Sequence, residues 1–212
     1  MTIKTLKHAL ITGFEPFGTP RPTENRSWEV VKQLVGKQID TGDSLVVCHC
    51  YQLPVSYNPV RELVPQLHRV QDFSIVIHCG AGVPGVVRLE KLAHRSGYVK
   101  PGNGGESDVP VDNCVSGYDT ADVLETAIDV DELRDALSNK GWSNLATSLD
   151  AGHYLCDFTY YISLAEGETT YKRDKQCQAP ATLFVHVPPS RNDPYSDTEL
   201  AEILCDVLRR IA

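Results

Sequence analysis

Apolar and polar positions along the chain follow two periods, that of extended strands and that of helices. Continuous apolar runs at His8–Gly13, Leu45–Leu53 and Phe73–Cys79 predict buried strands. Between and after them, apolar residues recur every three or four positions, as in Trp28–Val35 and Val60–Leu67, which predicts amphipathic helices. This alternation is typical of α/β proteins, in which a sheet lies between layers of helices.

Capping signals indicate where three of the helices begin. Asn58–Pro59 places a cap residue before a proline, which is favoured in the first turn of a helix. Asp129 with Glu132, and Ser196 with Glu199, have the three-residue spacing of a capping box. Each pair precedes an apolar stripe, so we expect helices to begin at both places.

The length and composition are those of one soluble domain. The chain has 212 residues, of which 42% are hydrophobic and 23% charged. We therefore expect a single domain over residues 1–212, folded as a three-layer α/β/α sandwich whose central sheet is mixed or mainly parallel. Residues 100–119 are rich in Gly and Pro and lack either period, which predicts a long irregular loop there.

Charge and cysteine usage exclude several classes of partner. A net charge of −8 without a basic run argues against nucleic acid, and no apolar stretch approaches the roughly 20 residues of a membrane span. The first apolar run is too short for a signal peptide, so we expect a cytoplasmic protein whose seven cysteines are free thiols. No Cys or His spacing indicates zinc, and we expect neither a metal nor another cofactor.

Cys156 is a candidate nucleophile because of its place between two elements. The short apolar run Leu145–Leu149 predicts a buried strand, and Leu155, Phe158 and Ile162 predict a helix directly after it. A thiol in the first turn of a helix lies at the positive end of the helix dipole, which favours the nucleophilic thiolate. The alternative is an inert buried cysteine, which is common.

His186 is a candidate partner for that thiol. It lies in the apolar segment Ala181–Val187, which Pro188–Pro189 stops. A polar residue at the end of a buried strand requires a partner, and ligands of open α/β sheets bind beyond the strand ends. The alternative is a core histidine with satisfied hydrogen bonds.

A competing motif is present at Gly80–Gly85, which fits the G-x-G-x-x-G pattern of dinucleotide-binding proteins and follows a predicted strand. In those proteins the motif opens a helix, whereas Val86–Glu90 is rich in β-branched residues and predicts an extended segment. A nucleotide-handling α/β enzyme is therefore the alternative function. We expect instead that the glycines allow a ligand to approach the backbone closely.

Four segments together resemble the pyroglutamyl-peptidase I family of cysteine peptidases, in the family's own order and over nearly the whole chain. They are Ile11–Gly18 with Asn25–Trp28, Leu89–Lys91 with His94, Asp150–Tyr161, and Phe184–Pro189. The resemblance implies a cysteine exopeptidase that hydrolyses the bond after an N-terminal pyroglutamyl residue through a thioester. Its substrates would be peptides that begin with pyroglutamate.

The resemblance also implies roles for individual residues. The family's catalytic triad of Glu, Cys and His falls on Glu90, Cys156 and His186, and its lactam pocket on Phe14 and Phe17. An inactive binding homologue is a further alternative, against which the intact triad argues. Many bacterial members have Asn directly after the nucleophile, whereas this chain has Asp157. The segment 100–120 also departs from the bacterial pattern. Whether the protein forms an oligomer is left open.

Overall fold

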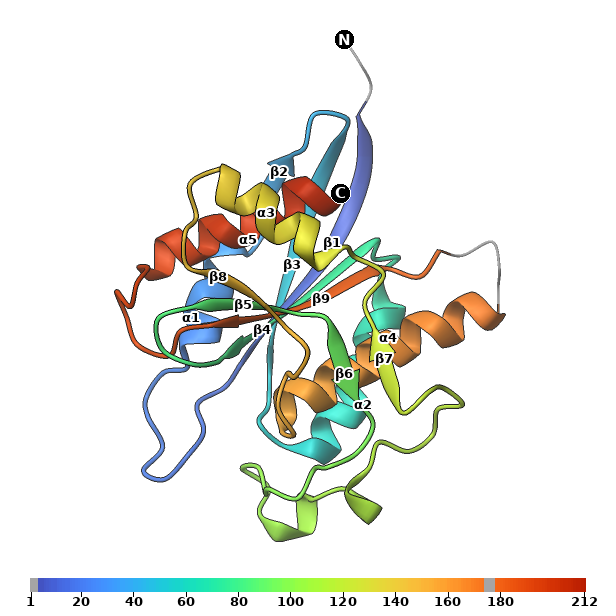
Figure 1. The fold of residues 1–212 in the computed structure, drawn as a ribbon. Helices are drawn as coiled ribbons and strands as arrows, with labels where there is room; N and C mark the ends of the chain where they lie inside the picture. The colour runs from blue at the N-terminus through green and yellow to red at the C-terminus, as the bar shows by residue number, and fades with distance from the viewer. Residues whose placement is uncertain (1–3, 174–177) are drawn as a thin grey trace.

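The computed structural model describes residues 4–173 and 178–212 of the chain (Figure 1). The strands are β1 (Thr5–Phe14), β2 (Gln38–Asp40), β3 (Ser44–Leu53), β4 (Ile75–Ala81), β5 (Val87–Glu90), β6 (Leu92–His94), β7 (Val123–Glu125), β8 (Leu145–Ser148) and β9 (Ala181–Val187). The α-helices are α1 (Arg26–Val31), α2 (Tyr57–Val70), α3 (Val130–Asn139), α4 (Leu155–Arg173) and α5 (Asp197–Ile211).

The main sheet is mixed and has the strand order β2-β3-β1-β4-β9-β5-β8. Its four central strands, β3, β1, β4 and β9, run parallel to one another. The pair β5 and β8 runs parallel within itself but antiparallel to β9, and β2 is antiparallel to β3. The predicted α/β fold with a mixed sheet is confirmed.

Helices cover both faces of the sheet, as Figure 1 shows, with α1, α3 and α5 on one face and α2 and α4 on the other. Successive strand residues point to opposite faces. In β1, Ala9 and Ile11 therefore pack under α1 and α5, whereas Leu10 and Phe14 pack under α2 and α4. The two apolar cores that result hold the strand ends in fixed relative positions.

Most predicted elements are present, with one difference in burial. The caps at Asp129 and Ser196 form as predicted, the second as a complete capping box with Glu199. The segment predicted as a buried strand, Leu145–Leu149, is instead β8 at the edge of the sheet, where its residues are half-buried and Leu149 is exposed. A short apolar run does not by itself distinguish a central strand from an edge strand.

The predicted start of α2 at Asn58 is wrong. The helix begins at Tyr57, and the Asp108 carboxylate accepts hydrogen bonds from the backbone N–H groups of Tyr57 at 2.6 Å and Asn58 at 2.8 Å. The hydroxyl of Ser56, the N-cap residue, also donates to Asp108, at 2.7 Å. Capping rules consider only neighbours in the sequence, and this acceptor is 50 residues away, in the Gly- and Pro-rich segment 100–119.

That segment contains two three-residue 3₁₀ helices, Glu106–Asp108 and Val111–Asn113. Across residues 4–173 and 178–212, none of the helices has both the length and the apolar character that crossing a membrane demands.

Candidate active site

Cys156 is the second residue of α4, so its thiol lies in the first helical turn, as predicted. The chain passes from the edge strand β8 to this helix through a turn in which Gly152 has φ +82°, a backbone conformation that glycine adopts without strain. The positive end of the α4 dipole therefore lies at the thiol.

His186 lies near the carboxyl end of β9, between β4 and β5. Alternation along β9 directs Leu183 and Val185 toward the core under α1 and α5. His186 and Phe184 consequently point to the opposite face, where α4 packs against β9. The imidazole therefore faces the layer that carries Cys156.

Glu90 reaches His186 from the antiparallel neighbour strand β5. Its Oε1 lies 2.8 Å from Nδ1 of His186, and the Glu90 side chain is fully buried. Glu90 was expected from family resemblance rather than from local pattern, and the reversed direction of β5 brings it beside the histidine. The structure therefore places the three residues of the expected triad together.

The surroundings of His186 favour its protonated form. Burial by itself lowers the pKa of this imidazole, but the negative charge and hydrogen bonding of the Cys156 thiolate and of Glu90 outweigh it and raise the pKa to about 9. A cation held between two anionic partners is the arrangement of a thiolate–imidazolium pair.

Two glycines make room for this pair. A Cβ atom on Gly80 would lie 2.9 Å from Sγ of Cys156, and one on Gly82 would lie 2.7 Å from Cβ of His186. Both are closer than real Cβ contacts, so any side chain there would displace the sulfur or the imidazole. The expected close approach was that of a ligand, whereas the groups that these glycines admit in the structure are Cys156 and His186.

The same geometry removes the basis of the nucleotide alternative. After Gly82 the chain turns into strand β5 rather than into a helix. A dinucleotide fingerprint requires a helix whose N-terminus faces the pyrophosphate, and none starts in this loop.

A cavity of about 160 Å³ opens beside the thiol. Its walls are mostly apolar or aromatic. The lining residues are Phe14, Phe17, Asn25, Val55, Ala81, Ala151, Tyr154, Leu155, Cys156 and His186.

Both expected pocket phenylalanines line this cavity. Phe14 ends β1, is almost fully buried and lies with its ring centroid 6.4 Å from that of Phe184. Phe17 is partly buried and lies 6.0 Å, centroid to centroid, from Tyr154. Sequence reasoning missed Tyr154 as a wall residue, although its place two residues before Cys156 could have suggested it.

Asn25 is a further cavity residue that was missed, and its amide is already engaged. Its Oδ1 accepts from the backbone N–H of Ser27 at 3.0 Å, and its Nδ2 donates to the carbonyl of Glu15 at 3.0 Å. Asn25 thus caps α1 and fixes the loop that carries Phe17, rather than presenting a free amide to a ligand.

Replacing Gly82 with alanine should impair catalysis without unfolding the protein. Its φ lies outside the glycine-only region, so Gly82→Ala adds only the clash with His186. We expect kcat/KM to fall about 100-fold, the cost of displacing a catalytic group by about 1 Å. Gly167→Ala is the matched control, because a Cβ there meets nothing closer than 3.5 Å. Equal activity of the two variants would contradict the prediction that a side chain at position 82 displaces His186.

This chain is similar to known proteins over nearly its whole length. The sequence profile of the family described as pyroglutamyl peptidase matches residues 7–199. Pyroglutamyl-peptidase 1 of Mus musculus is 34% identical over 207 residues, which cover 97% of this chain and 90% of the mouse protein.

Solved structures show the same fold. The crystal structure of pyrrolidone carboxyl peptidase from Fervidobacterium islandicum superposes with a TM-score of 0.73 at 27% identity, over 97% of this chain and 96% of that one. Pyroglutamyl peptidase I from Bacillus amyloliquefaciens gives a TM-score of 0.76 over 95% of this chain and 94% of that one. Its 21% identity supports the fold alone.

Proposed function

We propose that this chain, which belongs to the pyroglutamyl peptidase family, is a cysteine exopeptidase and removes an N-terminal pyroglutamyl residue from peptides. The observation that carries the proposal is the buried Glu90–His186 pair beside Cys156, at the wall of an aromatic cavity. In this proposal Cys156 is the nucleophile, His186 the acid and base, and Glu90 the residue that orients His186.

In the first half of the reaction, the Cys156 thiolate attacks the carbonyl carbon that joins pyroglutamate to the next residue. The carbonyl electrons move onto oxygen, and the backbone N–H groups at the start of α4 are suitably placed to stabilise that oxyanion. When the C–N bond breaks, His186 transfers its Nε2 proton to the leaving amine. A thioester between Cys156 and the pyroglutamyl group remains.

In the second half, His186 is neutral and accepts a proton from water, which attacks the thioester carbon. The C–S bond breaks, free pyroglutamate leaves and the thiolate–imidazolium pair is restored. Glu90 supports both halves, because its hydrogen bond to Nδ1 keeps Nε2 directed toward the cavity and its charge stabilises each imidazolium state.

The cavity suits the chemistry of a lactam. Pyroglutamate has no charged amine, so its ring requires no acidic partner and can lie between aromatic walls. Phe14 and Phe17 supply such walls, and backbone polar groups of the lining loops can pair with the ring N–H and C=O.

A cytoplasmic location belongs to the same proposal. All cysteines that the structure describes are free thiols, and a thiolate nucleophile requires a reducing compartment to stay reduced. The substrates are proposed to be peptides with N-terminal pyroglutamate.

Hydrolysis of a fluorogenic pyroglutamyl amide by the purified protein tests the function directly. Release of the fluorophore in the presence of a reductant supports the proposal. Absence of turnover, with a folded protein and a reduced Cys156, would refute it.

Removing the charge of Glu90 should change the pH dependence of the reaction. The raised pKa of His186 keeps its imidazolium form up to about pH 9, so activity should decline as pH rises through that value. In Glu90→Gln the anionic partner is lost, and the alkaline limb of kcat/KM should move from about 9 toward the ordinary 6.5. At pH 8 this lowers activity about tenfold or more.

The control is Glu106→Gln, which removes an equal charge from an exposed position on the 100–119 segment. Its alkaline limb should match that of the unaltered protein. An unchanged limb in Glu90→Gln would show that Glu90 does not set the protonation of His186.

A further inference from the structure

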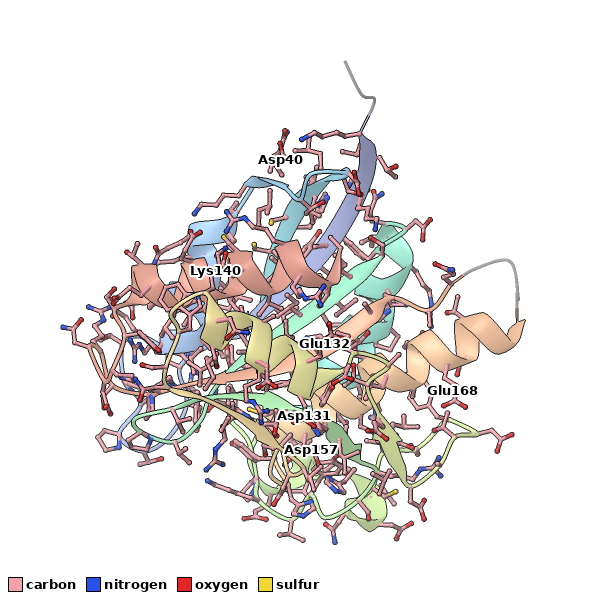
Figure 2. The ribbon with its side chains drawn as sticks, turned by 45° about the horizontal axis from the view of Figure 1, so that its top comes forward. Asp40, Asp131, Glu132, Lys140, Asp157 and Glu168 are labelled. Atoms are coloured by element: carbon pink, nitrogen blue, oxygen red, sulfur yellow. The ribbon has the colours of Figure 1, made fainter. Side chains whose placement is uncertain are left out.

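A second cluster of ionisable side chains lies behind the nucleophile, and its side chains take no part in the proposed reaction. His94 ends β6, His153 lies in the turn before α4, and Asp157 is in the first turn of α4. Figure 2 shows Asp157 at the opposite end of the molecule from Asp40. Asp157 follows Cys156 directly, but successive helical residues point about 100° apart. The thiol lies beside Gly80, whereas the carboxylate faces β6.

Three donor atoms converge in this cluster. Oδ2 of Asp157 lies 3.4 Å from Nδ1 of His94 and 3.9 Å from Nδ1 of His153. All three atoms lie within 4.8 Å of one another. Tetrahedral zinc with ligands at about 2.0–2.1 Å places its ligand atoms about 3.3 Å apart, so small rotations of the two rings produce that geometry.

One ring nitrogen of the cluster has no hydrogen-bond partner among the described residues. The Asp157 side chain is fully buried, and its Oδ2 lies within 3.9 Å of Nδ1 of both imidazoles. Nδ1 of His94 is buried and has no hydrogen-bond partner among the described residues. A buried ring nitrogen without a partner costs free energy, and a cation bound between Nδ1 of His94 and the Asp157 carboxylate would supply that partner.

The surrounding structure orients these ligands. Oδ1 of Asp157 accepts the backbone N–H of His94 at 3.1 Å, and the Tyr98 hydroxyl donates to Oδ2 at 3.3 Å. Gly97 lies under the His153 ring, where a Cβ would come within 2.7 Å of Nδ1. Outer contacts of this kind hold metal ligands in position. The His153 side chain is 50% exposed, which leaves a path for an ion from solvent.

We propose that His94, His153 and Asp157 form a binding site for a divalent transition-metal ion of the zinc type. Two imidazole nitrogens and one carboxylate oxygen suit Zn²⁺ and its neighbours rather than Ca²⁺ or Mg²⁺, which prefer oxygen. Water completes the coordination on the exposed side. This site was not expected from the sequence, because its ligands have no recognised zinc spacing.

The site has a consequence for the neighbouring cavity. The turn that carries His153 also carries Ala151 and Tyr154, which line that cavity. An ion that joins this turn to β6 restricts the movement of both wall residues. Metal occupancy is therefore coupled to the shape of the cavity, whatever ligand the cavity accepts.

Calorimetric titration of ZnCl₂ into the Cys156→Ala protein tests the proposal, because that variant lacks the reactive thiol as a competing ligand. We expect one equivalent of Zn²⁺ to bind and to raise the melting temperature. In the same background, His153→Ala and Asp157→Asn should each weaken binding by at least about tenfold, as expected for loss of a ligand. Asn has the size and shape of Asp and keeps an oxygen that can accept the backbone N–H of His94, so the second variant should fold.

His49→Ala is the matched control, because His49 pairs with His8 at 2.9 Å on another part of the sheet and should not affect the affinity. With Co²⁺ as the probe, the expected visible spectrum lacks a thiolate charge-transfer band. Absence of stoichiometric binding, full affinity in His153→Ala, or a thiolate band would each overturn the site. None of these measurements depends on peptidase activity, so they stand apart from the proposed function.

Discussion

Cys156→Ala should abolish peptidase activity, with a loss of kcat of about 10⁴-fold or more, because the acyl group then has no atom to which it can be transferred. The thiol is partly exposed at the cavity wall, so its removal leaves the apolar cores intact. The same thiol should react first with iodoacetamide at neutral pH, because it lies in the first turn of α4 beside His186, whose raised pKa favours the imidazolium form. Peptide mapping after brief alkylation measures this directly.

Cys114→Ala is the control for this prediction. Cys114 is also partly exposed, but its Sγ contacts the carbonyl of Val115 at 3.4 Å and has no imidazole partner there. This variant should keep full activity and full labelling at Cys156. An active Cys156→Ala protein, or equal alkylation of both cysteines, would refute the assignment of the nucleophile.

Pyroglutamyl amides should be cleaved in strong preference to prolyl amides, by about 10⁴-fold in kcat/KM. Proline has the same five-membered ring but lacks the ring carbonyl and carries a charged amine. Polar groups that pair with the lactam would be left unpaired, and the amine would be buried against Phe14 and Phe17 without an acidic partner in the cavity wall. Parallel assays with pyroglutamyl, prolyl and alanyl amides measure the ratio.

Phe17→Ala tests the role of the pocket in substrate binding independently of the reactivity of Cys156. Phe17 is only partly buried, so its loss should lower kcat/KM for pyroglutamyl substrates about tenfold or more while alkylation of Cys156 continues at the same rate. Phe14→Ala is a poorer test, because Phe14 is a core residue whose truncation costs about 3–5 kcal/mol of stability. Comparable rates on prolyl and pyroglutamyl amides would refute the substrate assignment even if Cys156 proved to be the nucleophile.

Local pattern was sufficient for most elements of this protein. Strand and helix periods depend on which side chains face the core, and capping depends on residues three positions apart. The strand that carries His186, the helix that has Cys156 in its first turn and the capping box at Ser196 were therefore predictable. The position of a thiol at a helix start follows from the same local rules.

The sequence pattern alone did not indicate Glu90, which was expected only from resemblance to a family. It lies 96 residues before His186, and their contact exists because β5 lies antiparallel beside β9 in the sheet. The roles of Gly80 and Gly82 also depend on tertiary contacts, since the atoms that a Cβ would meet belong to α4 and β9. Strand order is set by packing of the whole sheet, which no local window contains.

The cap of α2 and the proposed metal site were likewise decided by tertiary structure. Asp108 reaches Tyr57 from the 100–119 segment, and His94 meets Asp157 only after β6 packs against α4. The sequence determined which segments become strands and helices, because that choice depends on neighbouring residues. Which side chains meet was decided by the folded chain, because buried polar groups must find partners wherever the packing of the apolar cores places them.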